Sequence, residues 1–170
     1  MVSLLESRLR LKRSIKFNSN NSGFTLLEIS LVVVLLGVVL CIAIPSLQKP
    51  YARYQLQVAA RQLVGDIRYL EQTAQSKESN NYKITFDYTN DCYYMQENTG
   101  TLPNGYKKLP GSVDLNPTNF TGNILKIKQD GTIVKNGHVR LSSKLKVGDI
   151  YVIVYQYTGR VRVSNQPPPP

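Results

Sequence analysis

The stretch Ser22-Gly23-Phe24-Thr25-Leu26-Leu27-Glu28 decides the fold, because it opens a long apolar run that carries one carboxylate near its start. The run continues without another charge to Ile44. About 20 apolar residues in a helix cross the roughly 30 Å hydrocarbon core of a bilayer, so residues 24–44 predict a transmembrane helix. A carboxylate in such a helix costs about 2.5–3.5 kcal/mol near the centre and less near the end. Glu28 is therefore predicted to be functional and to have a cationic partner.

Residues 1–23 form a basic segment in front of this helix. The basic residues outnumber the single acidic residue, Glu6: they are Arg8, Arg10, Lys12, Arg13 and Lys16. Basic segments next to a membrane helix stay on the cytoplasmic side, so the N-terminus is predicted to be cytoplasmic and the rest of the chain to lie outside. The whole chain has a formal net charge of +10, and its basic excess extends beyond this segment.

Three interpretations of the N-terminal block compete. A cleaved secretory signal has an apolar core of about 7–15 residues, and Cys41-Ile42-Ala43 offers a cleavage site, but the apolar run is too long. A plain signal anchor explains the length and leaves Glu28 unexplained. A leader cut after Gly23 retains the whole helix and creates a new amine at Phe24. A chain that keeps its leader would function as a membrane-anchored sensor or scaffold, and the mass of the mature chain distinguishes this third function from the two that follow from cleavage.

Gly23, Phe24 and Glu28, with the basic leader before them, resemble the class III signal of type IV prepilins and type II secretion pseudopilins. The resemblance implies that a prepilin peptidase cuts between Gly23 and Phe24 and methylates the Phe24 amine. It also implies that Glu28 pairs with this amine in a neighbouring subunit, because a buried pair costs less than a lone buried charge. Other pilins or pseudopilins, contacted through helix 24–77, and an inner-membrane assembly platform are the implied partners.

The two cysteines indicate which class of pilin-like protein the chain resembles. Cys41 lies in the apolar run and Cys92 in the soluble part, so no disulfide is predicted. Major type IVa pilins usually close a C-terminal loop with a disulfide. The sequence therefore favours a pseudopilin or a minor pilin, and leaves the role of Cys92 open.

Residues 45–79 predict an amphipathic stem helix. Pro45 and Pro50 each remove a backbone donor and crowd the preceding turn, so a kink or local melting is expected there. Small and aliphatic residues then recur at spacings of three and four: they are Leu56, Ala60, Leu63, Ile67, Leu70 and Ala74. A coiled coil is the alternative, but strand-like sequence follows, so this face is predicted to pack on a sheet.

Residues 80–164 predict a β-rich domain. Alternating segments with turn residues between them indicate strands at 82–88, 92–96, 124–128, 132–134, 138–142 and 150–157. Asp130-Gly131 marks a hairpin turn. Residues 97–122 are rich in Asn, Gly, Pro and Thr and predict long loops with at most one strand. Residues 165–170 predict an exposed proline-rich tail.

The predicted fold class is α+β and pilin-like, with one long N-terminal helix packed on a C-terminal antiparallel β-rich domain. The helix has a membrane-spanning half and an amphipathic half. After the leader and the membrane helix, the chain has room for one modest globular domain. The order of helix, strands, Asp-Gly hairpin and a final Gly-Arg-Val-Arg-Val segment is similar to the GspH/FimT group of minor pseudopilins and pilins.

The sequence predicts neither an enzyme nor a cofactor or metal site. His138 is the one histidine of the sequence and lies in an alternating segment typical of a surface strand. Cys92 has no recognisable base nearby in the sequence. Asp87, Asn90 and Asp91 offer oxygen ligands without the spacing of an EF-hand loop, so an ordinary turn is predicted.

The C-terminal segment is basic and contains Gly159-Arg160-Val161-Arg162. Further cations lie upstream, at Arg140, Lys144 and Lys146, and tyrosines lie among them, at Tyr151, Tyr155 and Tyr157. Cations and aromatic rings together bind nucleic acids. In FimT-like pilins of DNA-uptake systems a Gly-Arg-x-Arg motif is implicated in DNA binding, and residues 159–162 match it. Alternation alone explains the same residues: Thr158-Gly159 turns, Val161 and Val163 face the core, and both arginines face solvent.

Two functions follow from these observations. The first is a minor pseudopilin subunit of a type II secretion-like filament, processed after Gly23, anchored in the cytoplasmic membrane by one helix and assembled through it. The second is a minor type IV pilin of a DNA-uptake system that binds DNA through Arg160, Arg162, Arg140, Lys144 and Lys146. Both use the N-terminal third in the same way, so the sequence leaves both open.

Overall fold

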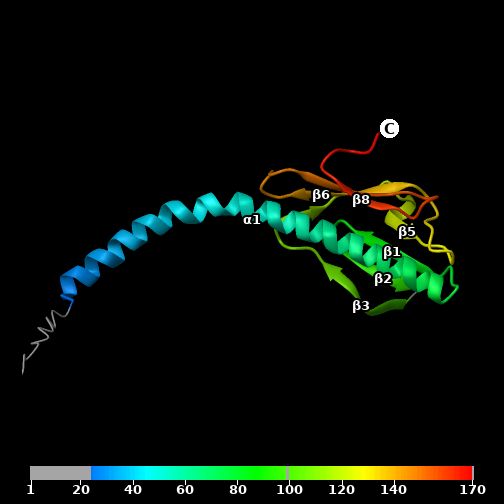
Figure 1. The fold of residues 1–170 in the computed structure, drawn as a ribbon, viewed down its shortest axis with the longest axis horizontal. Helices are drawn as coiled ribbons and strands as arrows, with labels where there is room; N and C mark the ends of the chain where they lie inside the picture. Colours follow the sequence, from blue (N-terminus) through cyan, green and yellow to red (C-terminus); the bar gives the residue numbers. More distant parts are fainter. Residues whose placement is uncertain (1–23, 99, 170) are drawn as a thin grey trace, which may run out of the picture. The chain divides into compact units, whose positions relative to one another are not determined.

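The computed structural model describes residues 24–98 and 100–169, and the predicted leader with Gly23 lies outside the described residues. The chain divides into two compact units, which meet in the sequence between Cys41 and Ile42. Helix α1 (Leu26–Ser76) provides the described part of the first unit and opens the second. All the strands belong to the second unit (Figure 1).

Two antiparallel sheets make up the β part of the second unit. The first has the strand order β3-β2-β1-β5 and the second has the order β4-β6-β7-β8. The strands are β1 (Tyr82–Asp87), β2 (Cys92–Glu97), β3 (Gly100–Lys108), β4 (Val113–Leu115), β5 (Ile124–Lys126), β6 (Gly137–Ser143), β7 (Asp149–Val154) and β8 (Val161–Ser164). A short 3-10 helix, η1 (Thr121–Asn123), precedes β5. One helix packed on antiparallel sheets confirms the predicted fold class.

The core of the second unit lies between the apolar face of α1 and the two sheets. All six residues of the predicted face are at most 2% exposed: Leu56, Ala60, Leu63, Ile67, Leu70 and Ala74. They belong to one cluster of buried residues with Tyr82 and Ile84 of β1 and Val139 and Val152 of the second sheet. Burying a large aliphatic side chain contributes about 1.5–3 kcal/mol, so this face holds the sheets on the helix.

The C-terminal end of α1 is closed by backbone hydrogen bonds. The Ser79 N–H donates to the Ala74 carbonyl at 3.1 Å and the Glu78 N–H to the Gln75 carbonyl at 3.2 Å. Glu78 has a φ of 47°. This pair of bonds around one left-handed residue is the Schellman motif, which satisfies carbonyls that the last helical turn leaves free. The helix therefore ends close to the predicted position.

The expectation of local melting at the two prolines was wrong. Helix α1 runs unbroken from Leu26 to Ser76 with Pro45 and Pro50 inside it. Each proline still deprives one carbonyl of its N–H donor. Between them, the Ser46 hydroxyl donates to the Ala43 carbonyl at 2.8 Å and adds a local bond to this weakened stretch. The kink assigned to Pro45 and Pro50 stays a prediction.

The strands differ from the predicted ones mainly at the sheet edges. Two strands, β3 and β4, lie in residues 97–122, where at most one was expected. Residues 132–134 form no strand; Ile133 makes an isolated bridge to Ile127 around the Asp130-Gly131 turn. Strand β7 ends at Val154, earlier than expected.

Candidate functional site

The start of α1 carries the residues predicted for filament assembly. Phe24 is 76% exposed, and Glu28 is exposed in the first helical turn. The Glu28 N–H donates to the Thr25 hydroxyl oxygen at 3.2 Å. Thr25 thus caps the helix, and Thr25-Leu26-Leu27-Glu28 matches the capping-box pattern, in which a carboxylate in the first turn also favours the helix dipole. Glu28 therefore has a local structural role that the sequence reasoning overlooked, although the Thr-x-x-Glu spacing signals it.

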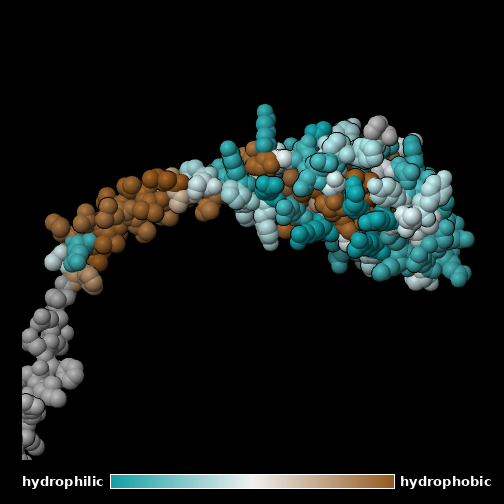
Figure 2. All heavy atoms as spheres, turned by 45° about the horizontal axis from the view of Figure 1, so that its top comes forward, coloured by the Kyte–Doolittle hydropathy of each residue, from teal (hydrophilic) through white to brown (hydrophobic). Residues whose placement is uncertain are grey.

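The helix that follows Glu28 presents an apolar surface. Within α1, an 18-residue stretch reaches a mean hydropathy of 3.0 and none of it is buried. Leu36 and Val38 are both more than half exposed, as are their apolar neighbours. Figure 2 shows hydrophobic atoms over this stretch and mostly hydrophilic atoms over the second unit. By length and composition, this helix is able to cross a membrane.

Two of the five cations predicted for DNA binding are paired with carboxylates. Arg140 donates to Asp149 Oδ2 from Nη2 at 2.7 Å and from Nε at 3.1 Å. Lys144 Nζ lies 3.1 Å from Asp91 Oδ2 and 3.3 Å from Asp114 Oδ1. The hydrogen bonds that Lys144 donates to these two aspartates raise its pKa. Arg140 and Lys144 are thus partly neutralised by the fold itself.

Arg160 and Arg162 are the exposed cations at the other end of this segment. Arg162 lies on β8 opposite Ile153 of β7, and Arg160 lies just before β8. Neither has a carboxylate within 4.0 Å in the part of the chain that the structure describes. Tyr157, in the preceding loop, is 85% exposed. The structure therefore places two free guanidinium groups in the same region of the chain as one exposed ring.

The alternation predicted for β8 holds at one valine only. Val161 is 6% exposed, whereas Val163 is 39% exposed and does not belong to the core. Val163 pairs with Val152, and β8 forms the edge of its sheet. An edge strand of four residues has one neighbour and less cover, so its last residues escape burial.

The predicted turn after β1 is confirmed, and Asp91 has a further role. Asp87 accepts hydrogen bonds from the backbone of Thr89 and Asn90 and from the Asn90 side chain. Asp91 accepts a bond from the Leu115 N–H at 2.9 Å in addition to binding Lys144. In residues 24–98 and 100–169, no group of His, Cys, Asp and Glu side chains is arranged to hold a metal ion.

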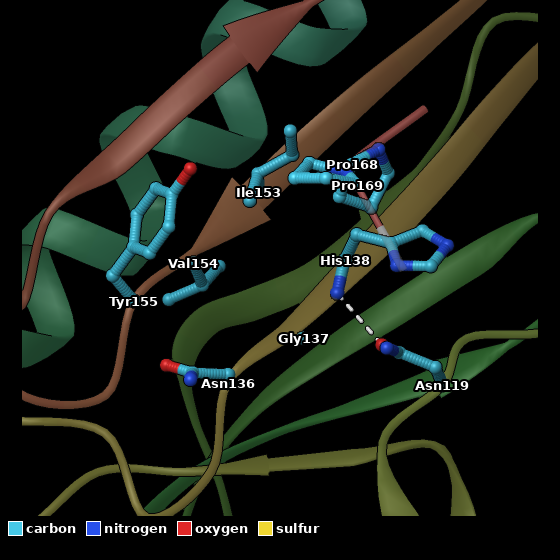
Figure 3. A pocket seen from close by; sticks show the side chains of 9 residues that line it. All are labelled: Asn119, Asn136, Gly137, His138, Ile153, Val154, Tyr155, Pro168 and Pro169. Carbon is cyan, nitrogen blue, oxygen red and sulfur yellow. Dashed lines mark hydrogen bonds between the residues drawn. The ribbon is translucent and has the colours of Figure 1, made fainter. Parts of the chain in front are cut away.

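The C-terminal tail lies on the outer face of the second sheet, so the prediction of a wholly exposed tail was wrong at Pro168. Pro168 is half-buried and lines a cavity of about 200 Å³ with Pro169, His138 and Ile153 (Figure 3). Ile153 is only 4% exposed although its neighbours Val152 and Val154 take the core side. Burial lowers the pKa of His138, whose backbone N–H donates to Asn119 Oδ1 at 2.7 Å.

Glu71 is a half-buried carboxyl that the sequence did not single out. Its Oε1 atom is inaccessible to solvent and has no hydrogen-bond partner in the described chain. It lines a polar recess of about 370 Å³ between α1, the Asp130-Gly131 turn and the loop with Gly159. Burial raises the pKa of Glu71 to about 7, against the opposing charge of Arg68. The recess joins residues far apart in the sequence, so no local pattern signals it.

The two cysteines are free thiols. Cys92 is buried, at 1% exposure, and its Sγ lies 3.6 Å from the Tyr94 hydroxyl oxygen. Cys41 is exposed on the apolar part of α1. A buried thiol without a neighbouring base is typical of a structural cysteine.

No protein-family model matches the chain, and no curated protein matches its sequence. Among solved structures, the chain is similar to that of the minor pseudopilin EpsH from the type 2 secretion system of Vibrio cholerae. The two share 11% sequence identity with a TM-score of 0.49, and the similarity covers 65% of this chain and 97% of the other. An identity this low transfers no residue role from one chain to the other.

Proposed function

We propose that this chain is a minor pseudopilin-like subunit that is anchored in the cytoplasmic membrane by α1 and assembles into a filament through that helix. The observation that carries the proposal is that the two parts of α1 differ in burial. Its C-terminal part is the core of the second unit, whereas its N-terminal part exposes apolar side chains and one carboxylate, Glu28. Such a surface needs a membrane or other helices to cover it.

The Gly23-Phe24 junction is the proposed processing site. A prepilin peptidase cleaves this bond and methylates the Phe24 amine, which then supplies a cation for Glu28 of a neighbouring subunit. Pairing lowers the cost of a carboxylate among apolar helices and fixes the register of two subunits. The inner-membrane assembly platform and other pilin-like subunits are the proposed partners.

The intact mass of the mature chain tests the processing step. In cells with an active prepilin peptidase, the mass is expected to correspond to residues 24–170 with one added methyl group. A Gly23→Val variant, which adds a branched side chain next to the bond, is expected to retain the leader. Recovery of the full-length wild-type chain from these cells would favour an unprocessed anchored protein.

Incorporation into filaments tests the role of Glu28. Glu28→Ala and Glu28→Gln are both expected to insert in the membrane and to assemble poorly, because both remove the charge. Ser30→Ala is the matched control, because it removes a side-chain bond to the Leu27 carbonyl in the same part of the helix and no charge. Wild-type incorporation of Glu28→Gln would argue against the charge pairing.

DNA capture is the second candidate function, and the exposure of Arg160 and Arg162 without carboxylate partners favours it. Residues 46–170, which contain the whole buried core, are suited to a DNA titration against salt. Each lost phosphate contact lowers the salt slope by about 0.9, so Arg160→Ala/Arg162→Ala is expected to lower it by about two units. Lys107→Ala/Lys108→Ala, on the first sheet, removes the same charge as a control. No binding at low salt would leave the secretion role.

A further inference from the structure

A basic groove lies where the stem part of α1 meets the loop between β6 and β7. Its lining comes from two segments: Lys49, Pro50 and Arg53 of the helix, and Leu145, Lys146 and Val147 of the loop. The groove has a volume of about 580 Å³. In Figure 1 the β6–β7 hairpin reaches along the helix at this position.

The three cations of this groove lack carboxylate partners. Among the described residues, no carboxylate oxygen lies within 4.0 Å of the side-chain nitrogens of Lys49, Arg53 or Lys146. The contrast with Lys144 in the same loop is direct, because Lys144 contacts both Asp91 and Asp114. Three unpaired cations around one hollow attract an anion, and phosphate is one that both Lys and Arg bind well in proteins.

The loop is built to hold Lys146 at its tip. Lys146 has a φ of 53°, in the left-handed region that usually takes glycine or asparagine. Its N–H donates to the Ser143 carbonyl at 2.9 Å, and the Leu145 N–H donates to the Ser143 hydroxyl at 3.3 Å. Ser143 is buried. Two hydrogen bonds to a buried serine therefore fix the turn. Leu145, beside Lys146, is 44% exposed.

The helical side of the groove has the composition of a membrane interface. Lys49 and Arg53 lie in the turns of α1 that follow directly after the apolar run. Tyr51 lies between them in the sequence and is 61% exposed, and Tyr54 follows Arg53 and is 63% exposed. Tyrosines collect at the headgroup level of a bilayer, and long basic side chains extend to the phosphates there.

From these observations we infer that the groove binds the phosphate of an anionic phospholipid headgroup. Lys49, Arg53 and Lys146 contact the phosphate, while Leu145 and Val147 contact the apolar part of the lipid next to it. This inference rests on the proposed membrane anchoring of α1. It adds a contact between the β domain and the lipid surface, and it assigns Lys146 to lipid instead of DNA.

A single tryptophan reports on the loop, because the natural chain contains none. The full chain with Leu145→Trp is placed in phosphatidylcholine vesicles that contain brominated acyl chains, with or without phosphatidylglycerol. Bromine quenches tryptophan fluorescence at short range, so the quenching measures how close the loop lies to the lipid. Phosphatidylglycerol is expected to increase the quenching at low salt, and the increase is expected to fall as salt rises.

The charge variants decide whether the groove causes this increase. The phosphatidylglycerol-dependent increase in quenching is expected to disappear in one triple variant of the Leu145→Trp chain, Lys49→Gln/Arg53→Gln/Lys146→Gln. Lys107→Gln/Lys108→Gln/Lys126→Gln removes the same charge from the first sheet and is expected to keep it. Equal loss in both variants would show a response to net charge alone and would overturn the inference.

Two further measurements separate the possible outcomes. Leu36→Trp, in the apolar part of α1, is expected to be quenched in both vesicle types. Absence of this quenching would contradict the proposed membrane insertion of α1. If Leu36→Trp is quenched and phosphatidylglycerol does not change the quenching of Leu145→Trp, only the proposed lipid site is contradicted. Soluble glycerol phosphate or DNA, at matched ionic strength, is expected to leave the phosphatidylglycerol-dependent increase in Leu145→Trp quenching in place. If either one abolishes this increase, the groove binds that soluble anion, and the proposed lipid site is overturned.

Discussion

The carboxyl of Glu71 lies against Gly159: a β-carbon on that glycine would come within 4.0 Å of Glu71 Oε1. Gly159 has a φ of 58°, which also favours glycine. The recess around Glu71 thus lies directly beneath the loop that leads into Arg160 and Arg162. A change in the charge of Glu71 therefore takes place next to that loop.

Glu71→Gln is expected to stabilise the protein at pH 8. The pKa of Glu71 rises from 4.5 to about 7 on folding. The folded state therefore holds a proton that the unfolded state has lost, and stability falls as pH rises from about 4.5 through 7. A shift of this size corresponds to about 3 kcal/mol, which partial solvent exposure reduces to about 1 kcal/mol. Chemical denaturation of residues 46–170 at pH 5 and pH 8 measures it; an equal effect at both pH values would contradict the charge-based explanation.

Leu63→Ala is expected to lower the free energy of unfolding by about 2–5 kcal/mol, because Leu63 is fully buried between α1 and the sheets. Val58→Ala changes the 40% exposed side of the same helix and is expected to stay within about 0.5 kcal/mol. Denaturant titration of both variants is the measurement. Similar losses in both variants would contradict the burial explanation, because alanine has the higher helix propensity and propensity alone predicts no loss at either position.

Gly137→Ala is expected to destabilise the β domain by about 1–3 kcal/mol. A β-carbon at Gly137 would clash with the Phe120 ring, at its Cε1 and Cζ atoms. Phe120 is buried and cannot move freely. Gly111→Ala is the control, because a β-carbon there has no neighbour within 4 Å in the described chain. Thermal melts should separate the two variants.

Deleting residues 167–170 is expected to raise the pKa of His138 toward its ordinary value of about 6.5. The pKa is lowered by burial, and Pro168 and Pro169 provide part of that cover. An NMR titration of this one histidine measures the change. Pro167→Ala, at an exposed position, should leave the pKa as it is. If the deletion has no effect, the strands alone bury the ring.

The stem face and most central strands were predictable because their burial follows a local period. Leu56 to Ala74 recur at helical spacing, and the residues of β1 alternate between buried and half-buried positions. The two strands that the sequence did not predict, β3 and β4, each lie at the edge of a sheet. Most of β3 is exposed and it contains Pro103, so it shows neither alternation nor a typical strand composition. Edge strands tolerate both, since they have one partner only.

The parts of the site that depend on distant contacts were not predictable. Ile153 faces away from the helix and alternation makes it a surface residue, yet the tail buries it. Arg140 and Lys144 look like free cations until the fold brings Asp149, Asp91 and Asp114 to them. Arg160 and Arg162 meet no such partner in the described chain. Local sequence predicts which residues are charged, and only the tertiary structure determines which charges stay available.

Pro103 also affects how the domain behaves when many copies are crowded together. It removes one backbone donor from β3, the outermost strand of its sheet, and the pairing of β3 with β2 is irregular between Tyr94 and Gln96. An outer strand interrupted in this way is a poor template for pairing with the same strand of another molecule. The first sheet is thus protected against edge-to-edge aggregation on its β3 side.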